Sequence, residues 1–416
     1  MTAPERKRLS SWKEIAAYLQ REVRTVIRWE KERGLPVRRV PGGQGRSVFA
    51  FTDELDRWAS GQMPPEEAAA APAPRSRRPW MATAGAAVLA VAGAAAVFAG
   101  VWPHRHLGLV VLGPGFVEGR DEAGRAVWSH SLPGLVEQPD RRLAQVADLT
   151  GDGHPEAIVG PLVGREIGTG SLIALDERGQ TMWSASLDDR WTFGAGRFEA
   201  PWQPDEVEVF RRGDEAFVAW SVHHLTWWPS MVAVFDGGGK RRGTFVNAGW
   251  IRTTRGTLDG RHLIAGGFSN SRNGAAFAVL DAANPGGSSP EDPGSLFECR
   301  DCPAGRPVRY LVVDWSDIAA SVPTDERAVV ISVHPVTGTI ELRARQRLSA
   351  ELIVELSPTF EIRRQAASDS FWEWHRQLET TGAITHPRER CPFREGPVVR
   401  VWSAENGWTV DRPTRR

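Results

Sequence analysis

The sequence predicts a multidomain chain with a small α+β N-terminal domain, a single transmembrane α-helix and a large all-β C-terminal domain. Three observations predict it: helical spacing of apolar residues near the N-terminus, a charge-free apolar run after it, and repeated strand–turn–strand segments beyond that run. A length of 416 residues leaves room for two or three domains. The expected parts are a first domain at 1–60, a linker at 61–79, a transmembrane helix at 80–102 and a β domain at 103–416.

The segment from Leu9 to Gly34 has the spacing of two short helices. Ser11 can cap the first helix, with Glu14 three residues later completing a capping box. Gly34 ends the second helix. Two helices joined so tightly form a helix-turn-helix unit. Their apolar inner faces are expected to carry Ile15, Ala16 and Leu19 in the first helix, and Val23, Val26 and Ile27 in the second.

A basic hairpin and a closing helix are predicted next. Residues 35–51 alternate apolar and basic side chains around a Gly-Gly-Gln-Gly turn, and residues 52–58 form a capped helix. In order and spacing, the segments SWKEIAAYL, VRTVIRWEKERGLPV and RSVFAFTDELDRW resemble the MerR/excisionase-type winged helix-turn-helix family across residues 9–59. The resemblance implies a DNA-binding domain.

The charge of the first domain agrees with a DNA partner. Residues 1–60 carry about 13 lysines and arginines against about 8 acidic residues. On the second helix, Arg24, Thr25, Arg28 and Lys31 share one broad side, as side chains that enter a major groove do. The hairpin arginines Arg38, Arg39 and Arg46 are expected to hold phosphates or the minor groove. The alternatives are a solvated charged face and a protein–protein contact.

The apolar run from Trp80 to Trp102 carries no charge and is about as long as a helix that crosses a bilayer. A cleaved signal peptide would begin at the N-terminus, and a core helix would be amphipathic, whereas this run is apolar all round. A Pro/Ala-rich tether precedes it. The arginines at its first end, Arg75, Arg77 and Arg78, predict a cytoplasmic N-terminus, and hence a single-pass inner-membrane protein with a periplasmic or extracellular β domain.

Small residues in the run also allow a homodimer through the transmembrane helix. Ala86, Ala90 and Ala94 are spaced four apart, as in closely packed helix pairs. An alanine-rich composition would also produce this spacing by chance.

The C-terminal part repeats a strand–turn–strand segment. Where they are clear, successive copies lie about 45–60 residues apart, which is the period of a β-propeller blade. We therefore predict a propeller of six or seven blades, with a pair of β-sandwiches as the alternative. The copies are Arg120–Leu132, Leu175–Leu187, Phe235–Phe245, Leu280–Gly287 and Trp402–Val410.

Tryptophans follow the first two turns, at Trp128 and Trp183. These hairpins resemble the repeats of quinoprotein (PQQ-type) propellers, in which a tryptophan docks one blade on the next. Nothing else in the sequence suggests a bound quinone, and no paired acid/base or nucleophile constellation is present. We therefore expect a protein that is not an enzyme.

The acidic loop Asp148–Glu156 predicts one calcium site. Oxygen-bearing residues alternate along it, with Gly151 and Gly153 permitting a tight turn. It resembles the calcium loops of FG-GAP/VCBS propeller repeats of the integrin-α type, although Thr150 stands where Asn or Asp is usual. A hairpin turn that holds no ion is the alternative. The expected ligands are Asp148, Thr150, Asp152, the carbonyl of His154 and Glu156.

All three cysteines lie beyond the apolar run, which fits an oxidising compartment. Cys299 and Cys302 could form a local disulfide, a redox pair or half of a zinc site. One disulfide and one spare thiol is the expected arrangement, with Cys299–Cys302 the candidate disulfide. A zinc site built from Cys299, Cys302, Cys391 and His386 is a further alternative.

Two further segments could contact a ligand or pack against the domain. His223–Pro229 is a loop in which Trp227 or Trp228 could stack on a sugar or peptide, with core packing expected for one of them. Residues 368–380 predict a capped amphipathic helix that seals the β domain. Its inward residues are expected to be Phe371, Trp374 and Leu378.

Together these parts resemble ToxR-type membrane-anchored one-component regulators, with a different sensor. The expected function is transcription regulation, in which the calcium-binding propeller senses an external ligand or protein and the cytoplasmic domain binds DNA as a pair. The alternative is a calcium-stabilised surface propeller that acts as a binding or adhesion module. In that case the N-terminal domain would be a protein-interaction anchor.

Overall fold

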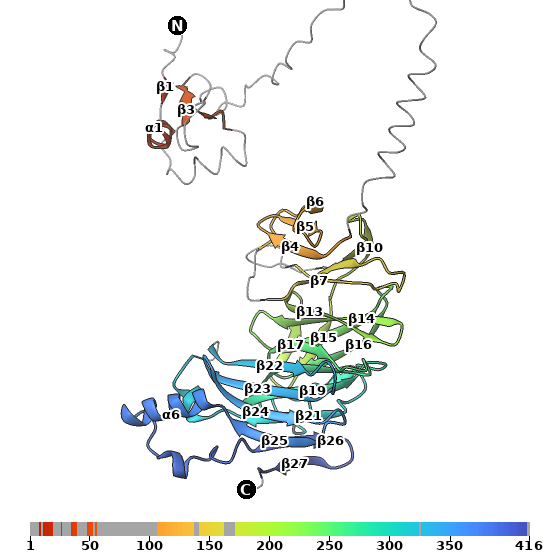
Figure 1. Cartoon of the computed structure of the whole chain (residues 1–416), viewed down its shortest axis with the longest axis vertical. Coiled ribbons are helices and arrows are strands. Elements are labelled where there is room, and N and C mark those ends of the chain that lie inside the picture. The colour runs from red at the N-terminus through yellow and green to blue at the C-terminus, as the bar shows by residue number, and fades with distance from the viewer. Residues whose placement is uncertain are drawn as a thin grey trace, which may run out of the picture. The chain divides into compact units, whose positions relative to one another are not determined.

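The computed structural model divides the chain into two compact units, Met1–Ala99 and Gly100–Arg416 (Figure 1). The predicted linker and the apolar run 80–102 lie outside the described residues. Within the described part of the chain, no helix combines the length and apolar character needed to cross a bilayer. The structure describes residues 8–9, 11–19, 26, 35–39, 48–52, 55, 106–136, 141–161, 171–323 and 326–413.

The first unit contains the capped helix and the hairpin expected from the sequence. Helix α1 spans Trp12–Tyr18, and the Ser11 hydroxyl accepts a hydrogen bond from the Glu14 amide at 3.2 Å. Strand β2 (Arg38–Arg39) pairs antiparallel with β3 (Val48–Phe51). The sequence did not predict strand β1 (Arg8–Leu9), which pairs with the other edge of β3.

One small core holds this unit together. Ile15 and Ala16 of α1 are buried with Val48 and Ala50 of β3, as the apolar spacing predicted. Of the second helix, the structure describes Val26 alone, and this residue is fully buried. Trp12, Leu19 and Val37 pack against a buried set made up of Leu9, Ile15, Ala16, Val26, Leu35, Val48, Ala50 and Leu55.

The second unit is built mainly of antiparallel β-sheets whose strands follow one another in chain order. The first sheet has β4 (Leu109–Gly113), β5 (Phe116–Arg120) and β6 (Ala126–Ser131). The second has β7 (Ala144–Ala147), β8 (Glu156–Val159), β9 (Leu172–Leu175) and β10 (Thr181–Ala185). The third has β13 (Trp202–Arg212), β14 (Glu215–His224), β15 (Ser230–Asp236) and β16 (Arg241–Asn247).

A fourth and a fifth sheet complete this series. The fourth has β17 (Ile251–Gly256), β18 (His262–Ser269), β19 (Gly274–Asp281) and β21 (Arg309–Asp314). The fifth has β22 (Ala328–Val333), β23 (Ile340–Arg347), β24 (Ala350–Leu356) and β25 (Ile362–Ala367). Strands β11 (Arg190–Phe193) and β12 (Gly196–Glu199) form a separate hairpin.

Hydrophobic cores lie between successive sheets because the inner strands bury both faces. On β14, Val218 and Trp220 belong to the core shared with the second sheet, whereas Phe217 and Ala219 belong to the core shared with the fourth. A strand buried on both faces is a continuous apolar run rather than an alternating one. This is why the segment AFVAWSV carries no polar residue before Ser221.

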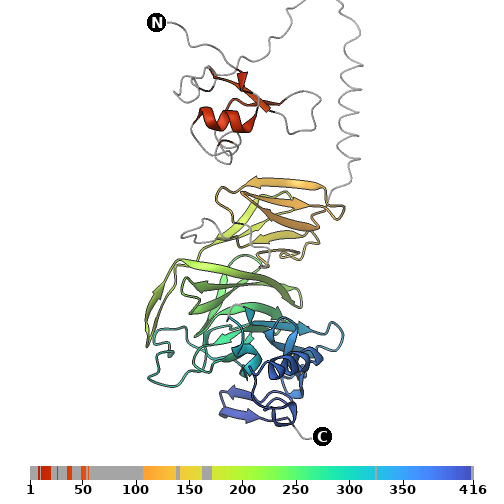
Figure 2. The ribbon, with the colours of Figure 1, turned by 90° about the vertical axis from the view of Figure 1, so that its left-hand side faces the viewer.

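The sheets contact one another in order through their first strands. Strand β4 lies against β7, β7 against β13, β13 against β17, and β17 against β22. In Figures 1 and 2 the first sheet lies at one end of this unit, and the fourth and fifth sheets lie together toward the other end. The mostly β architecture expected from the sequence is therefore present, as a row of packed sheets.

The sheet count differs from the predicted six or seven blades, because the described residues form five such sheets. Two of the predicted copies of the repeat, Leu280–Gly287 and Trp402–Val410, supply strands to sheets that other copies also serve. Strand β20 (Gly287–Ser288) pairs in parallel with β16, and the hairpin of β26 (Val399–Ser403) and β27 (Gly407–Asp411) extends the fourth sheet beside β21.

The repeated turns have the same hydrogen bonds in the first three sheets. One carboxylate oxygen of the leading aspartate accepts the amide four residues later, at 2.9 Å for Asp121, 2.7 Å for Asp176 and 2.9 Å for Asp236. The fourth residue of each turn is a glycine with positive φ, as at Gly179 (80°) and Gly239 (83°). The predicted strand–turn–strand repeat is therefore confirmed.

The tryptophans after the first two turns dock on the turn of the following sheet. A Cβ at Gly179 would lie 2.7 Å from the Trp128 ring, and a Cβ at Gly239 would lie 2.5 Å from the Trp183 ring. The Trp183 indole also donates a hydrogen bond to the Gly237 carbonyl at 2.9 Å. These tryptophans are packing residues, as expected.

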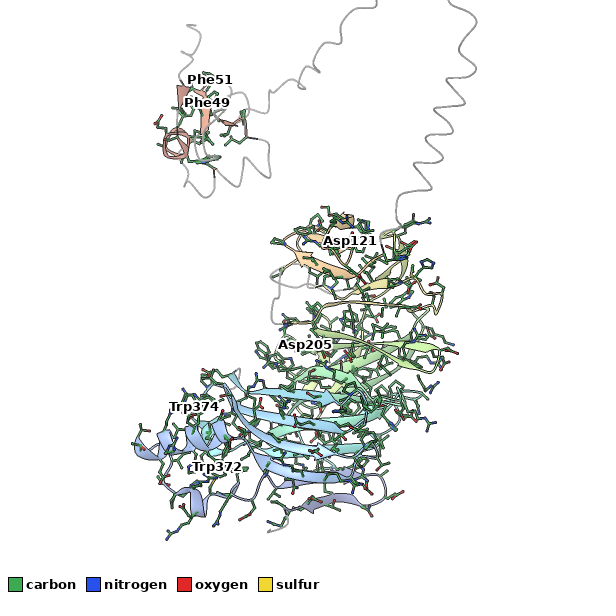
Figure 3. The ribbon with its side chains drawn as sticks, viewed as in Figure 1. Phe49, Phe51, Asp121, Asp205, Trp372 and Trp374 are labelled. Carbon is green, nitrogen blue, oxygen red and sulfur yellow. A yellow bond between two sulfur atoms is a disulfide. The ribbon has the colours of Figure 1, made fainter. Side chains whose placement is uncertain are left out.

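Two helices pack against the fifth sheet, α6 against β24 and α5 against β23. Helix α6 spans Asp369–Thr380, and the Ser368 hydroxyl accepts the Phe371 amide at 3.1 Å, so the predicted capped helix is confirmed. Figure 3 shows Trp372 and Trp374 on this helix, beside the sheet. Phe371 is fully buried, and Trp374 and Leu378 pack partly buried against the same core. The short helices α5 (Asp317–Ala320) and η2 (Arg388–Arg390) flank it in sequence.

Candidate functional site

The predicted DNA-contacting residues fall mostly outside the described residues. This holds for Arg24, Thr25, Arg28, Lys31 and Arg46. Arg38 and Arg39 form β2, where their backbones pair with Phe49 and Val48 of β3. The structure therefore places two of the seven predicted DNA residues, both on the hairpin.

The acidic loop joins β7 to β8 and is closed by its own hydrogen bonds. The Asp148 carboxylate accepts the Gly151 amide at 2.6 Å and the Gly153 amide at 3.1 Å. Asp152 accepts the His154 amide at 2.8 Å. Glu156, which is 4% exposed, accepts the Leu149 amide at 2.6 Å. Each predicted carboxylate thus bonds a backbone amide of the loop.

Two carboxylates of this loop have shifted pKa values in opposite directions. Burial raises the pKa of Glu156, and the nearby charges of Asp152 and Asp148 add to the rise. For Asp148, burial acts in the same upward direction, but the amides of Gly151 and Gly153 and the charge of Arg211 outweigh it and lower its pKa. The Arg211 guanidinium lies at this loop, where it donates a hydrogen bond to the Asp148 carbonyl.

Calcium binding by this loop would need its oxygen ligands to converge on one point. A calcium ion is surrounded by about six to eight oxygen ligands. Among the described residues, the three carboxylates are not one of the groups whose ligand atoms lie within 4.8 Å of one another. The His154 side chain instead lies near Glu177, with its Nδ1 3.0 Å from a carboxylate oxygen, and near the exposed His106. The calcium site stays a prediction from the sequence.

A cleft of about 440 Å³ lies along the first strands of the sheets. Its lining comes from the segment before β7 and from β13, β17, β22 and β23. Five arginines and two carboxylates line it, and four of the arginines form ion pairs with carboxylates. The charged lining residues are Arg141, Arg142, Arg252, Arg255, Arg345, Asp205 and Glu206.

Ion pairs between half-exposed arginines and buried carboxylates lie at this cleft. Arg142 donates to Glu206 and to Glu208, each at 2.8 Å, and Arg255 donates to Glu206 at 3.0 Å. Burial raises the pKa of Glu208, although the neighbouring arginines oppose the rise. Removing one partner of such a buried group would leave an uncompensated charge. These residues therefore fix the cleft wall in one arrangement.

An aspartate–histidine pair lies at one end of the cleft, in the middle of the row of sheets, where Figure 3 labels Asp205. One carboxylate oxygen of Asp205 lies 2.7 Å from Nδ1 of His223, and the other accepts the Trp250 indole N–H at 3.0 Å. Both Asp205 and His223 are buried. The pair therefore positions the Trp250 ring at the cleft wall.

Trp227 extends this group to the surface. Its ring stacks on His223 with centroids 5.2 Å apart and contacts Trp250 at 4.5 Å, while 52% of Trp227 stays exposed. Trp228 packs against Phe193, Phe198 and Phe297 instead. The expectation that one of the two tryptophans packs in the core is confirmed.

Sequence reasoning found the Trp227 loop but missed the rest of this cleft. The sequence feature that could have predicted the cleft is the acidic run on β13. There Asp205, Glu206 and Glu208 occur in a segment otherwise typical of a buried strand. Buried acidic residues need charged or hydrogen-bonding partners. The positions of those partners, Arg142 and Arg255, depend on how three sheets pack.

The structure joins Cys299 to Cys302 by a disulfide, and Cys391 is a free, buried thiol. A zinc site that combined these three cysteines with His386 does not form, because the sulfurs of Cys299 and Cys302 are bonded to each other. Cys391 and His386 do lie together, with His375 as the third residue of the group.

Neither a protein-family model nor a curated protein sequence matches the chain. Among solved structures, the Dos1 propeller matches at a TM-score of 0.38 and 11% identity, over 61% of this chain and 55% of that chain. Hydrazine synthase from Kuenenia stuttgartiensis matches at 0.35 and 14%, over 61% and 60%. The Synechocystis apocarotenoid oxygenase matches at 0.33 and 12%, over 72% and 65%.

This chain therefore spans less than two thirds of the length of each of those three chains.

Proposed function

We propose that this chain is a membrane-anchored one-component transcription regulator. In this proposal residues 1–60 form a winged helix-turn-helix that binds DNA in the cytoplasm, residues 80–102 span the inner membrane, and the β unit senses a ligand or partner outside. The observation that carries the proposal is the first unit. Its capped helix and its hairpin share one core, as the parts of a winged helix do.

The surroundings of that core agree with DNA binding. The second helix that the sequence predicts and the hairpin arginines belong to a segment with an excess of positive charge. Backbone phosphates attract such a surface, and paired heads read two half-sites of a palindrome. Dimerisation through the transmembrane helix would supply that pairing.

The experiment that tests the proposal is a gel shift of the full chain in lipid nanodiscs on genomic fragments, over a range of salt concentrations. The double substitution Arg24→Ala with Arg28→Ala should abolish the shift. A matched control removes two exposed arginines of the β unit, Arg197→Ala with Arg363→Ala, and should leave it intact. Unchanged binding by the first variant would refute the assigned DNA face.

If the wild-type chain binds no DNA even when artificially dimerised, the surface-binding function is the better account. That second function has one feature in its favour. The exposed Trp227 stands beside an arginine-lined cleft, a combination suited to an anionic ligand with a flat ring or a sugar.

We assign ligand sensing to this cleft. A thermal-shift screen of sugar acids and aromatic acids against the full chain tests the assignment. A ligand that raises the midpoint should lose its effect in Trp227→Ala, whereas Trp183→Phe, in the packing between sheets, should retain it. A ligand whose effect survives Trp227→Ala binds elsewhere.

A further inference from the structure

The segment between β25 and β26 brings two histidines and the free cysteine together. His375 lies on α6, His386 in the loop after it, and Cys391 follows η2. The ligand atoms of all three lie within 4.8 Å of one another. His375 is 2% exposed and Cys391 is 6% exposed, so the group is largely shielded from solvent.

The two histidines face each other through the nitrogens that a metal would bind. Nε2 of His375 lies 3.3 Å from Nε2 of His386. Two imidazole nitrogens on one tetrahedral zinc, each about 2.0–2.1 Å from the ion, are about 3.3–3.4 Å apart. The observed spacing therefore equals that of a ligand pair.

A carboxylate lies near the other nitrogen of each histidine. Nδ1 of His375 is 3.8 Å from Glu379, and Nδ1 of His386 is 3.6 Å from Asp317. Both distances are longer than a hydrogen bond, but a shift of a few tenths of an ångström would let each carboxylate accept the Nδ1 proton, as the outer partners of metal-bound histidines do. Without an ion, this contact is a hydrogen bond in which one Nε2–H donates to the other Nε2, and a zinc ion between the two nitrogens would replace that proton.

Space and a polar group are available beside these atoms. A cavity of about 30 Å³ is lined by all three residues and by Ser316. The Ser316 hydroxyl is buried and has no hydrogen-bond partner among the described residues. Buried hydroxyls are usually satisfied, and a cavity of this size holds one water. A metal-bound water would satisfy it.

We propose that His375, His386 and Cys391 bind one Zn²⁺, with a water at the fourth position held by Ser316. Two imidazoles and a thiolate suit zinc, and Asp317 and Glu379 orient the histidines. The ion would connect α6, the loop after it and η2. The proposed zinc site does not depend on the proposed DNA binding or on the predicted calcium loop.

Zinc binds neutral imidazoles and a thiolate, so binding would displace the proton of the Cys391 thiol and release it to solvent.

The first test is cobalt substitution of the full chain in nanodiscs, which needs no mutation. The chain has three cysteines, two of them in the disulfide, so Cys391 is the sole thiol. We expect a sulfur-to-cobalt charge-transfer band and the intense visible bands of tetrahedral cobalt. Cobalt bound without a charge-transfer band, or no bound cobalt, would overturn the proposal.

The second test measures zinc retained per chain by elemental analysis, together with the zinc dissociation constant. Wild type should retain one zinc, and Cys391→Ser and His375→Ala should lose it. Asp317→Asn should weaken binding by about 10–100-fold, the range for outer partners of a ligating histidine. His154→Ala is the matched control, because His154 belongs to the exposed group with His106 and Glu177, and it should retain zinc.

Zinc retained by Cys391→Ser, or lost in His154→Ala, would contradict the assignment. If a variant fails to fold, the cobalt spectrum of the wild type still decides the question, since it reports the thiolate directly.

Discussion

The acidic loop and the histidine–cysteine group satisfy their polar atoms in different ways. In the loop, Asp148, Asp152 and Glu156 accept backbone amides within a few residues, so the segment is complete as it stands. In the group around His375, the ligand atoms face one another across a small cavity, beside an unsatisfied Ser316 hydroxyl. Carboxylates that are close in sequence can thus be used up as acceptors for the amides of their own turn. Side chains that come together only in the fold can instead line a cavity in which an ion could bind.

The largest expected effect is on stability, through zinc. With free zinc at about 100 times its dissociation constant, binding to the folded chain should add about 2.7 kcal/mol to the free energy of unfolding. A chelator should remove this gain, which thermal or urea melts of the full chain measure. In His386→Ala zinc should add nothing, and an equal gain in that variant would erase the contrast between the two regions.

The next effect sharpens the other side of the comparison. Glu156→Ala removes the acceptor of the buried Leu149 amide, and an orphaned buried donor costs about 1–3 kcal/mol. Glu156→Gln keeps an acceptor oxygen and should lose less. Urea denaturation at neutral pH compares the two. Equal losses would mean that charge, rather than the hydrogen bond, holds the loop closed.

The loop carboxylates should also respond to pH in opposite directions. The pKa of Glu156 is raised, so its contribution to stability is full below its ordinary value of 4.5 and is lost as the pH rises through the folded value. The pKa of Asp148 is lowered, so its contribution is present above its ordinary value of 3.8 and is lost as the pH falls through the folded value.

Relative to Glu156→Gln, wild type should therefore lose stability as the pH rises from about 4.5. Relative to Asp148→Asn, it should lose stability as the pH falls below about 3.8. Urea melts across acidic pH test both signs, and parallel curves for wild type and both variants would contradict them.

Calcium should have the smallest effect. Both oxygens of Asp148 already accept amides, so we expect added calcium to shift the melting midpoint little. A clear rise that Asp152→Ala abolishes would instead support the calcium site that the sequence predicts.

Local features were the most predictable part of this molecule. The Ser11 cap, the hairpin of β2 and β3, the repeated turns and helix α6 each depend on residues within about a dozen positions. Strand β1 was missed, because two residues carry no period and its pairing with β3 is set by tertiary contact.

Non-local features were less predictable for the same reason. The hairpin of β26 and β27 was expected from its sequence, but its place beside β21 was not. His375 was overlooked on a helix whose inward face was otherwise identified correctly. A histidine four residues after the buried Phe371, together with a leftover cysteine, was the available signal.

The tryptophan contacts between sheets have a consequence for spacing. At Gly179 and Gly239 the ring of the preceding sheet occupies the volume that a side chain would need. The thickness of an indole thus sets how closely three consecutive sheets can approach at this edge. Exchanging either glycine for a larger residue would place its Cβ against the indole and force the two sheets apart at that turn.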